Sequence, residues 1–586
     1  MSSGMRDRPT KPDWVSQLAD RVVRRFEADQ QQTDRPAPTK AVCASGISPS
    51  GPIHLGNLRE LMVPHFVADE VRRRGVPCEH ILSWDDYDRL RKVPAGIDPD
   101  FTRHIGRPLT AVPDPHGELD SWAERFKAPL REAVDRLGIE LREISQTEQY
   151  RSGAYRAEIL TALDRREEIN EVLGRFRTLE QAKADDGADG DSPESAMESG
   201  AEDADDGDIG SDYWPYKVYC QDCGTDVTTI TGTTADGESL WIDYRCDSTG
   251  YEGRFDLSRE NHGKLVWKVD WPMRWAYEGV TFEAGGADHS SPGSSFSVGS
   301  ELVSRIYGGK APEYEAYSFV GTKGMGKMSS SAGAVPTPID ALQVVEAPLL
   351  RWMYVRKTPR QAITVDLGGG LGSLYDEWDA LGRKLAAGEA AGSQSLIMER
   401  ARTTVKGAVA AEPEAVVPFR TLTSAVAVAA DDDAQIARIV SQLTEVAADE
   451  MSTVEPRLAL ARTWVNDFAP EDDRIVVRSD PDAERLAELS EEERRWLDLL
   501  LAHLDDDWSL DGTKDLVYGV PKIAAGLPLD TPPTPELKVE QRTFFKLLYQ
   551  LFLSADTGPR LPTLLMALGP ERVRHLLGGA PVASSG

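Results

Sequence analysis

One stretch near the N-terminus decides the fold, and it reads Cys43-Ala-Ser-Gly-Ile-Ser-Pro-Ser-Gly-Pro-Ile-His-Leu-Gly-Asn-Leu-Arg-Glu-Leu61. Its first residues continue an apolar run from Ala41, which indicates a strand; glycines and prolines then indicate a turn, and a helix is expected from about His54. Glycines let the backbone approach a ligand closely, and the first amides of a helix attract an anion. We therefore predict a phosphate-binding unit with a nucleotide as its ligand.

A second glycine-rich stretch lies far downstream and reads Gly321-Thr-Lys-Gly-Met-Gly-Lys-Met-Ser-Ser-Ser-Ala-Gly333. Four glycines and three serines around two lysines are typical of a flexible loop rather than of a core segment. The lysines and hydroxyls could hold a triphosphate. A plain glycine–serine linker is the alternative interpretation.

The residues after His54 predict a parallel sheet. Apolar residues continue at helical spacing to Val71, Gly75 is expected to end the helix, and a second strand is predicted at residues 78–84. Strand, helix and strand within so short a span form a βαβ unit. Ligands of such sheets bind at the carboxyl ends of the strands, where Asp85 begins an acidic segment. A charged surface turn is the alternative there.

Charge and composition restrict the function classes. The 586 residues carry 66 basic and 97 acidic side chains, a net charge of −31, whereas RNA-binding surfaces are usually basic. An acidic, solvated surface suits a salt-loving host, so we expect activity to need molar KCl; a chain that binds no nucleic acid is the alternative. The sequence lacks both a long apolar run and an apolar leader, so we expect a cytoplasmic protein that binds no membrane.

Three of the five cysteines are grouped as a candidate metal site. Cys220-Gln-Asp-Cys223-Gly is followed by a β-rich stretch that contains Cys246, a pattern typical of a zinc knuckle. A fourth ligand is needed, and Asp247 and His262 are candidates. A knuckle that has lost its metal is the alternative.

The two glycine-rich stretches resemble the motifs of class I aminoacyl-tRNA synthetases. His54-Leu-Gly-Asn57 is similar to their HIGH motif, and Lys327-Met-Ser-Ser-Ser331 to their KMSKS loop, with Ser330 in place of the second lysine. Three further segments closely resemble the class I, archaeal-type lysyl-tRNA synthetases: residues 83–94, 265–275 and 283–289. In that family a further cysteine follows soon after the third, and Ser248 stands near its place here.

The resemblance implies an α/β fold: a Rossmann-like parallel-sheet catalytic domain, a zinc-knuckle-like insertion and an α-helical C-terminal half. The expected boundaries are 13–182 with 260–335 for the catalytic domain, 183–212 for an acidic disordered insertion, 213–259 for the knuckle, and 336–586 for the helical region that contacts the tRNA stem and anticodon. Late basic residues offer this region a phosphate-facing surface, namely Lys538, Arg542, Lys546, Arg560, Arg572 and Arg574, although an ordinary solvated face is the alternative.

The resemblance also implies the activity of a lysine–tRNA ligase, which joins lysine to tRNA(Lys) with ATP and Mg²⁺. The expected ATP contacts are Ser48, Gly51, His54, Gly56, Asn57, Lys327, Met328, Ser329, Ser330 and Ser331. Among them, the expected catalytic residues are His54, Asn57, Lys327, Ser329 and Ser331. The expected lysine contacts are Gly46, Ser48, Glu60, Asp85, Trp267, His289 and Tyr314.

The lysine contacts divide by chemistry, because a long alkyl-ammonium group needs an aromatic wall for its methylenes and a carboxylate for its charge. Trp267 and His289 are the candidates for the wall, and Glu60 and Tyr314 for the ammonium end. Two alternatives stay open: a class I ligase for glutamate or glutamine, and a tRNA-binding relative without catalysis. Cys220, Cys223 and Cys246 would hold structural Zn²⁺, and a monomer is expected.

Overall fold

The computed structural model describes residues 12–32, 36–185, 213–287, 290, 294–323, 325–327, 335–390, 392–429, 432–470 and 476–578, with the backbone alone for 177–185 and 325–327. The chain forms two compact units. Unit 1 comprises Met1–Leu342, Ala347–Val365 and Ala390–Ala410, and unit 2 comprises Gln343–Glu346, Asp366–Glu389 and Ala411–Gly586. The acidic segment expected to be disordered falls mostly outside the described residues.

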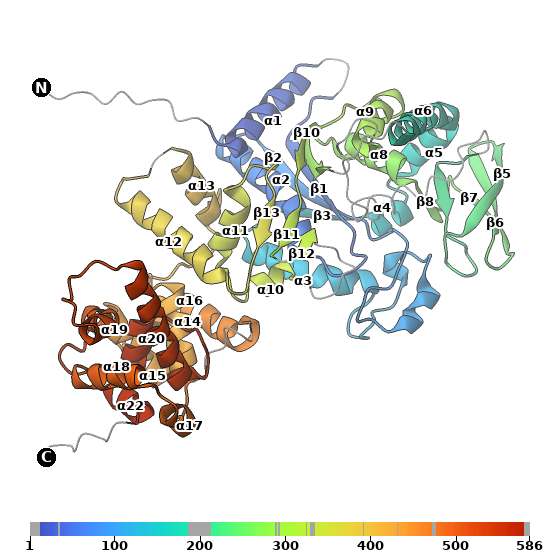
Figure 1. Ribbon diagram of the computed structural model, residues 1–586. Coiled ribbons are helices and arrows are strands. Elements are labelled where there is room, and N and C mark those ends of the chain that lie inside the picture. Colours follow the sequence, from blue (N-terminus) through green and yellow to red (C-terminus); the bar gives the residue numbers. More distant parts are fainter. Residues whose placement is uncertain are drawn as a thin grey trace, which may run out of the picture. The chain divides into compact units, whose positions relative to one another are not determined.

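A five-stranded parallel sheet organises unit 1 (Figure 1). Its strands are β1 (Ala41–Ile47), β2 (Cys78–Trp84), β3 (Arg142–Ser145), β9 (Phe282–Gly286) and β10 (Glu313–Tyr317), in the spatial order β3-β2-β1-β9-β10. The pairs β1–β2, β2–β3, β1–β9 and β9–β10 are all parallel. The order reverses between β1 and β9, and ligands of doubly wound sheets bind at such a switch point, beyond the carboxyl ends of the strands. The predicted Rossmann-like sheet is confirmed.

Helices cover both faces of this sheet. On one face, α1 (Trp14–Gln30) and α2 (Leu55–Arg73) pack on Cys43 and Phe282. On the other, α8 (Trp267–Glu278) and α9 (Ser295–Arg305) pack on Ala44 and Ile81. Successive side chains of a strand alternate between the faces, so Cys43 and Ala44 lie in opposite layers. Burial of both faces explains why the strands read as apolar runs.

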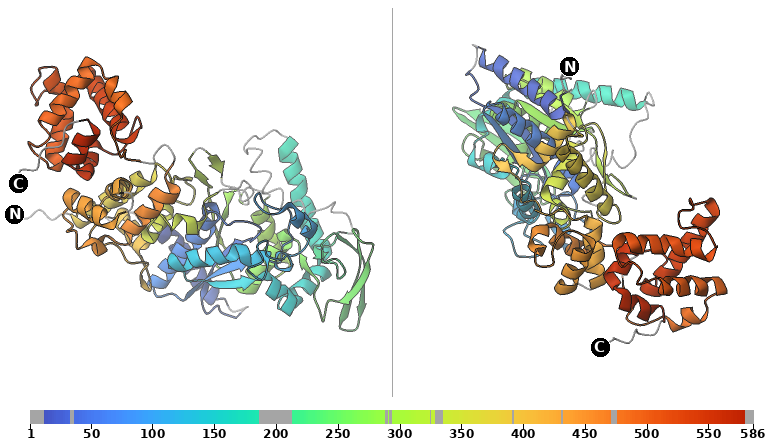
Figure 2. Two further views of the ribbon diagram at one scale, coloured as in Figure 1. Left: turned by 90° about the horizontal axis from the view of Figure 1, so that it is seen from below. Right: turned by 90° about the vertical axis from the view of Figure 1, so that its left-hand side faces the viewer.

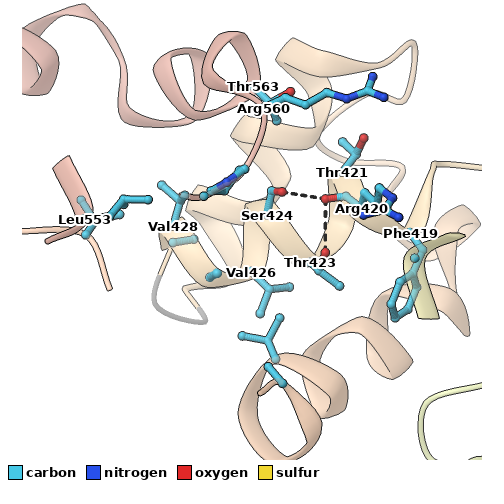
Figure 3. A pocket seen from close by; sticks show the side chains of 18 of the residues that line it. Phe419, Arg420, Thr421, Thr423, Ser424, Val426, Val428, Leu553, Arg560 and Thr563 are labelled. Carbon is cyan, nitrogen blue, oxygen red and sulfur yellow. Dashed lines mark hydrogen bonds between the residues drawn. The ribbon is translucent and has the colours of Figure 1, made fainter. Parts of the chain in front are cut away.

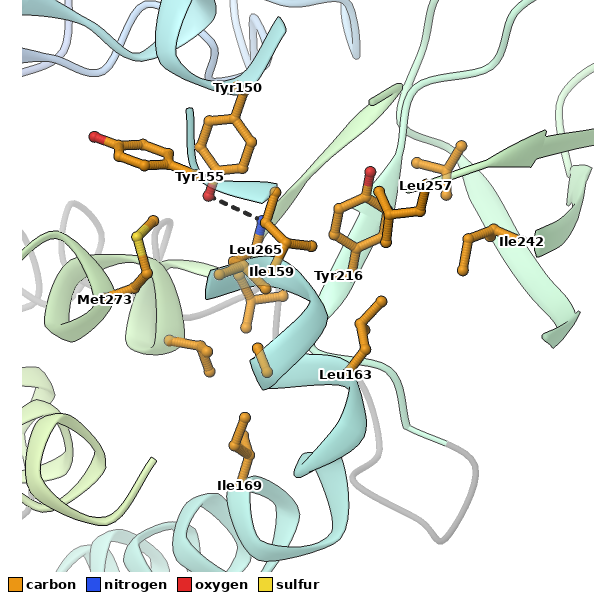
Figure 4. Packing of buried hydrophobic residues seen from close by; sticks show 14 of the residues in the cluster. Tyr150, Tyr155, Ile159, Leu163, Ile169, Tyr216, Ile242, Leu257, Leu265 and Met273 are labelled. Atoms are coloured by element: carbon orange, nitrogen blue, oxygen red, sulfur yellow. Dashed lines mark hydrogen bonds between the residues drawn. The ribbon is translucent and has the colours of Figure 1, made fainter. Parts of the chain in front are cut away.

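An insertion between β3 and β9 carries the cysteines. It contains α4 (Gln146–Ser152), α5 (Arg156–Asp164), α6 (Arg166–Asp185), the β4–β8 ladder (Tyr216–Val218 with Gly263–Leu265) and an antiparallel sheet of β5 (Thr228–Asp236), β6 (Ser239–Cys246) and β7 (Glu252–Asp256). That sheet stands at one end of unit 1 (Figure 1; Figure 2, left). Figure 4 shows the shared core, in which Leu163 and Tyr216 pack near Leu265, whose amide donates to the Tyr150 hydroxyl at 3.2 Å. Strand β8 leads directly into α8.

The remaining elements of unit 1 are short. They are α3 (Trp122–Arg136), β11 (Val320–Thr322), β12 (Met325–Lys327), α10 (Pro338–Ala341), α11 (Ala347–Val355), β13 (Ile363–Val365), α13 (Ser393–Arg402), β14 (Thr403–Thr404) and β15 (Gly407–Ala408). Strand β11 pairs with both β12 and β13.

Unit 2 is helical where the structure describes it, as the sequence predicts. Its helices are α12 (Leu371–Ala386), α14 (Phe419–Ala429), α15 (Asp433–Leu443), α16 (Arg457–Thr463), α17 (Ala483–Ala487), α18 (Glu491–Ala502), α19 (Leu510–Ala524), α20 (Pro535–Leu553), α21 (Leu561–Leu568) and α22 (Pro570–Leu576). A hollow of about 1260 Å³ opens among these helices, lined by Arg420, Arg560 and Arg572 with threonine and serine side chains (Figure 3). None of the helices in the described parts of the chain has the length and apolar character to cross a bilayer.

Candidate active site

The start of α2 is fixed by its own first residues. His54 is the N-cap: its Nδ1 accepts from the Asn57 amide at 3.3 Å, while the Asn57 side-chain oxygen accepts from the His54 amide at 3.1 Å. This reciprocal capping box satisfies two backbone donors of the first turn. Because Nδ1 accepts, a neutral His54 ring carries its proton on Nε2. Ser48 and Gly51 lie between β1 and this helix start, and Gly56 lies in its first turn.

The chain just after the predicted KMSKS-like loop contacts the start of α2. The Leu55 amide, the first of α2, donates to the carbonyl of Pro336 at 3.1 Å. Pro336 lies just after the glycine–serine stretch, whose Lys327 ends β12, paired through Gly321 with β11. The predicted KMSKS-like loop therefore follows β12. The chain after the loop, at Pro336, contacts the start of the HIGH-like helix α2. Met328, Ser329, Ser330, Ser331 and His289 lie outside the described residues.

Three carboxyl groups with raised pKa values interact with one another beside the parallel sheet: Glu60 of α2, Asp85 just after β2, and Glu283 in β9. Glu60 accepts from the Tyr317 hydroxyl at 2.5 Å and from the Gly46 amide at 3.3 Å. Desolvation nevertheless raises the pKa of Glu60 to about 8, and the nearby charges of Glu283 and Asp85 contribute to the rise. Burial likewise raises the pKa of Glu283 to about 7 and that of Asp85 above its usual range. Buried carboxylates that are so costly to ionise favour a cationic ligand.

Aromatic side chains pack against the same sheet. Trp267, the first residue of α8, stacks on Trp271 with ring centroids 5.3 Å apart and planes within 13°. Its buried indole N–H makes no hydrogen bond among the described residues. Tyr314 stacks on Phe296 at 3.9 Å and shares a 2.9 Å hydrogen bond with Ser290. The Tyr314 hydroxyl lies over Gly285, where a Cβ would come within 2.0 Å of it, so only glycine fits that position.

The acidic residues after β2 are held by cations from three other elements. Arg274 of α8 donates to Asp85 at 2.5 Å and also pairs with the buried Asp270. Lys127 of α3 binds Asp86 at 2.7 Å, and Lys264 of β8 binds Asp88. Asp86 also accepts from the Ser145 hydroxyl and the Thr147 amide. These carboxylates therefore fix the loop to its neighbours, and the charge of Asp85 also raises the pKa of Glu60.

Sequence reasoning missed Glu283 as a separate site residue. Both indole N–H groups that face it, from Trp271 and Trp275, donate to its carboxylate, the first at 3.0 Å. The signal that could have found it is one charged residue inside an otherwise apolar, glycine-rich strand. Tyr317, Arg274 and Lys127 were missed for another reason: they act across long sequence distances that local patterns do not encode.

The three grouped cysteines form a compact thiol cluster in the insertion. The sulfurs of Cys220, Cys223 and Cys246 all lie within 4.8 Å of one another, and those of Cys223 and Cys246 are 3.7 Å apart. Four sulfurs around one zinc ion at ~2.3 Å lie ~3.8 Å apart, so the cluster fits a tetrahedral ion. No described histidine, aspartate or glutamate joins the group. The suggested fourth ligands Asp247 and His262 therefore do not lie with the sulfurs.

Comparison with known proteins agrees with this geometry. Residues 12–404 match the family model described as tRNA synthetases class I (K). The chain is 49% identical to the lysine–tRNA ligase of Streptomyces coelicolor over 97% of this chain and 98% of that protein. It is 32% identical to the lysine–tRNA ligase of Pyrococcus horikoshii over 95% and 97%, and 30% identical to that of Treponema pallidum over 96% and 98%.

Parallel sheet, motif order and family match together define a class I aminoacyl-tRNA synthetase. Within that class, the chain belongs to the family of class I lysyl-tRNA synthetases.

Proposed function

We propose that this chain is a lysine–tRNA ligase whose reaction centre lies at the switch point between β1 and β9. The reaction has two steps: the lysine carboxylate attacks the α-phosphate of ATP and releases pyrophosphate, and the lysyl group then passes to the 3′-terminal adenosine of tRNA(Lys). The observation that carries the proposal is the set of three interacting carboxyl groups with raised pKa values, Glu60, Asp85 and Glu283, together with the Trp267–Trp271 stack and the capped start of α2.

The phosphate side of the centre is the start of α2. Nε2 of a neutral His54 ring would donate to a phosphate oxygen, since Nδ1 is held by the Asn57 amide. The helix N-terminus adds its partial positive charge. The proposed ATP contacts around it are Ser48, Gly51, Gly56, Asn57, Lys327, Met328, Ser329, Ser330 and Ser331. Catalysis needs no side-chain nucleophile here, because positioning and neutralisation of the charge on the departing pyrophosphate suffice.

Mg²⁺ accompanies ATP as part of the substrate and would neutralise phosphate charge when bound. The residues that approach the phosphates from the protein side are those around His54 and the predicted loop at 327–331. Strand β12 pairs with β11, and Pro336 contacts Leu55 of α2. Both ends of that loop therefore belong to unit 1, as α2 does.

The amino-acid side of the centre would take the lysine side chain. Its ammonium would meet Glu60, with Glu283 and Asp85 adding negative potential, and its methylenes would lie along Trp267 and His289. Tyr314, Gly46 and Ser48 complete the proposed contacts. A glutamate or glutamine side chain would find no compensation for these carboxylates, since the described cation among them, Arg274, is already paired with Asp85 and Asp270.

The tRNA would contact unit 2, where Arg560 and Arg572 line the hollow. Arginine and hydroxyl side chains are the usual phosphate contacts of RNA-binding surfaces. Other predicted contacts are engaged with acids: Lys546 pairs with Asp556 at 2.8 Å, and Arg574 pairs with Asp505. We also propose a structural zinc ion held by Cys220, Cys223 and Cys246. Cytoplasmic location, a monomeric state and a need for molar KCl stay predictions.

A charging assay tests the proposal. The full chain is incubated at high KCl with ATP, Mg²⁺, unfractionated tRNA and labelled lysine, glutamate or glutamine in separate reactions. We expect acid-precipitable label with lysine alone, and none when tRNA is omitted. Labelled tRNA in the glutamate or glutamine reaction would show that this amino acid, and not lysine, is the substrate. Binding of tRNA without charging by any of the three would favour the alternative without catalysis.

A further inference from the structure

The thiol cluster is built from two turns of the same form. The first reads Cys220-Gln-Asp-Cys223-Gly224 and the second reads Cys246-Asp-Ser-Thr249-Gly250. In each, the glycine amide donates to the carbonyl of the first cysteine at 2.8 Å, and each glycine has a positive φ, +80° and +74°. Such paired turns present residues 1 and 4 of each turn to a common centre. Three of those four positions hold cysteine, and the fourth holds Thr249.

The surroundings of Cys246 agree with this correspondence. In the first turn the Asp222 amide points at the sulfur of Cys220, at 3.4 Å. In the second turn the Ser248 amide and the amide and hydroxyl of Thr249 interact with the Cys246 thiol and lower its pKa. Amides that point at a sulfur stabilise its thiolate form, which is the form that binds a metal. The Thr249 hydroxyl therefore lies beside the sulfurs, in the place that a fourth thiol would take.

We propose that Thr249 occupies the fourth corner of the zinc site, so that the chain holds zinc through three thiolates and one exchangeable oxygen, a water or the Thr249 hydroxyl. This inference rests on the zinc ion proposed above and is independent of the aminoacylation activity.

The other candidates for this corner are engaged elsewhere. The Asp247 carboxylate accepts from the Thr229 hydroxyl at 2.8 Å and from Arg245 at 3.2 Å. The His262 Nε2 lies 3.1 Å from Glu260 and 3.2 Å from Gln221. Ser248 precedes the fourth position of the turn by one residue. Only Thr249 has the place in the turn that Cys223 has in the first.

With an oxygen at the fourth corner, the site binds zinc more weakly than four thiolates would and leaves the ion more accessible to water. A neutral hydroxyl is a poorer zinc ligand than a thiolate, and residues 247–250 are exposed, so water reaches the ion. Sites with three protein ligands and one open position are the kind that exchange their fourth ligand. We therefore expect a bound ion that chelators remove readily.

Two contacts connect the thiol-bearing turn to the segment that follows β2, so release of the ion would affect that segment. Tyr219, the residue before Cys220, donates its hydroxyl to the carbonyl of Tyr87 at 2.6 Å. Asp226, three residues after Cys223, pairs with Arg89 at 3.1 Å. Both contacts hold the segment that follows β2, so loss of the ion is expected to loosen Asp85 and its neighbours.

Cobalt substitution with two cysteine variants tests the proposal on the full-length protein. Reduced wild type, Thr249→Cys and Ser248→Cys are stripped of metal and titrated with Co²⁺, whose thiolate charge-transfer absorption rises with the number of bound thiolates. Loss of zinc to a chromogenic chelator is then followed for each. Ser248→Cys is the matched control, because it adds the same thiol one position away from the proposed corner.

We expect one ion per wild-type chain, with the absorption of three thiolates. Thr249→Cys should add the fourth thiolate and slow zinc loss by about a hundredfold, because one strong ligand of four is gained. Ser248→Cys should match the wild type. The proposal is overturned if the wild type binds no ion, if it already shows four strong ligands, or if both cysteine variants behave alike.

Discussion

The carboxyl ends of β1 and β2 look alike in the sequence and differ in the structure. Both follow buried parallel strands, and both carry a run of polar residues that a substrate could contact. After β1, His54 and Asn57 cap each other's backbone within one turn of helix. After β2, Asp85, Asp86 and Asp88 each bind a lysine or arginine from a distant element.

This difference distinguishes the start of α2, which we expect to bind the ligand, from the end of β2, which we expect to hold the fold together. The side chains at the start of α2 are positioned by a local capping box, whereas the carboxylates after β2 are held by ion pairs with distant elements. A buried carboxylate paired with Arg274 or Lys127 is compensated already, and removal of its partner leaves a buried charge. We therefore expect substitutions at the end of β2 to lower stability and substitutions at the start of α2 to lower the reaction rate.

The largest effect is expected from Arg274→Met. This change leaves Asp85 and Asp270 as buried charges without their cation and should destabilise unit 1 by about 3–5 kcal/mol. Hydrogen exchange of the β1 and β2 amides measures this locally. Arg420→Met is the matched control, since its pair with Asp376 is half exposed and worth about 0–1 kcal/mol. Equal effects of the two changes would contradict the framework role.

His54→Ala should slow adenylate formation by about 10²–10³, the cost of one lost charge-stabilising contact, or about 3–4 kcal/mol. His54→Asn is the informative partner, because asparagine also caps helices but has no ring to reach a phosphate. Both variants should lose the rate, while only His54→Ala should also lose about 1 kcal/mol of helix stability. A normal rate for His54→Asn in rapid-quench assays would show that the ring serves only as a cap.

Glu60→Gln should raise the KM for lysine about 10- to 100-fold, which corresponds to the loss of one hydrogen bond between charged groups. The KM for ATP should stay unchanged, because Glu60 lies one turn beyond the capped start of α2. Glu79→Gln gives a control, since that carboxylate pairs with the exposed Lys40 at the other end of β2. A parallel rise of both constants would indicate a general disturbance of the helix instead of a lost ammonium contact.

The smallest expected effect is a pH dependence of lysine binding. The Glu60 carboxyl, with its pKa of about 8, is mostly protonated at neutral pH and attracts an ammonium group only once ionised. Lysine keeps its side-chain charge to a pKa near ~10.4, so the KM for lysine should fall several-fold as pH rises from about 6.5 to about 9. Glu60→Gln should remove most of this slope. An unchanged slope in that variant would show that another group titrates. Glu283, with its pKa of about 7, would then be the next candidate.

Local patterns predicted the elements that position the site. Strand β2 begins at Cys78 and ends at Trp84, as the sequence predicts, and Gly75 follows α2 with φ +79° as expected. The sequence pattern from Gln394 to Ala410 predicts one continuous helix, and that prediction is wrong: α13 ends at Arg402, because Thr403 and Thr404 pair with Gly407 and Ala408 in a tight hairpin. β-Branched residues before a glycine favour such a turn over a continued helix.

The site itself was predictable where the information is local and not where it depends on folding. The capping pair His54 and Asn57 lies three residues apart, and its role is visible in the sequence. The pairing of Asp85 with Arg274 joins residues 189 positions apart, and the contact of Leu55 with Pro336 spans a still longer interval. Only the fold reveals that the acidic segment after β2 is already paired with cations from distant elements.

Amino-acid-dependent exchange between ATP and pyrophosphate tests the central claim most directly. The full chain at high KCl is given lysine, glutamate or glutamine, each with and without tRNA. Exchange with lysine alone is the predicted result and would assign the carboxylate cluster around Glu60 to the ammonium group. Exchange with glutamate or glutamine would contradict that assignment while keeping the ATP site, and no exchange with any of them would contradict catalysis at this centre.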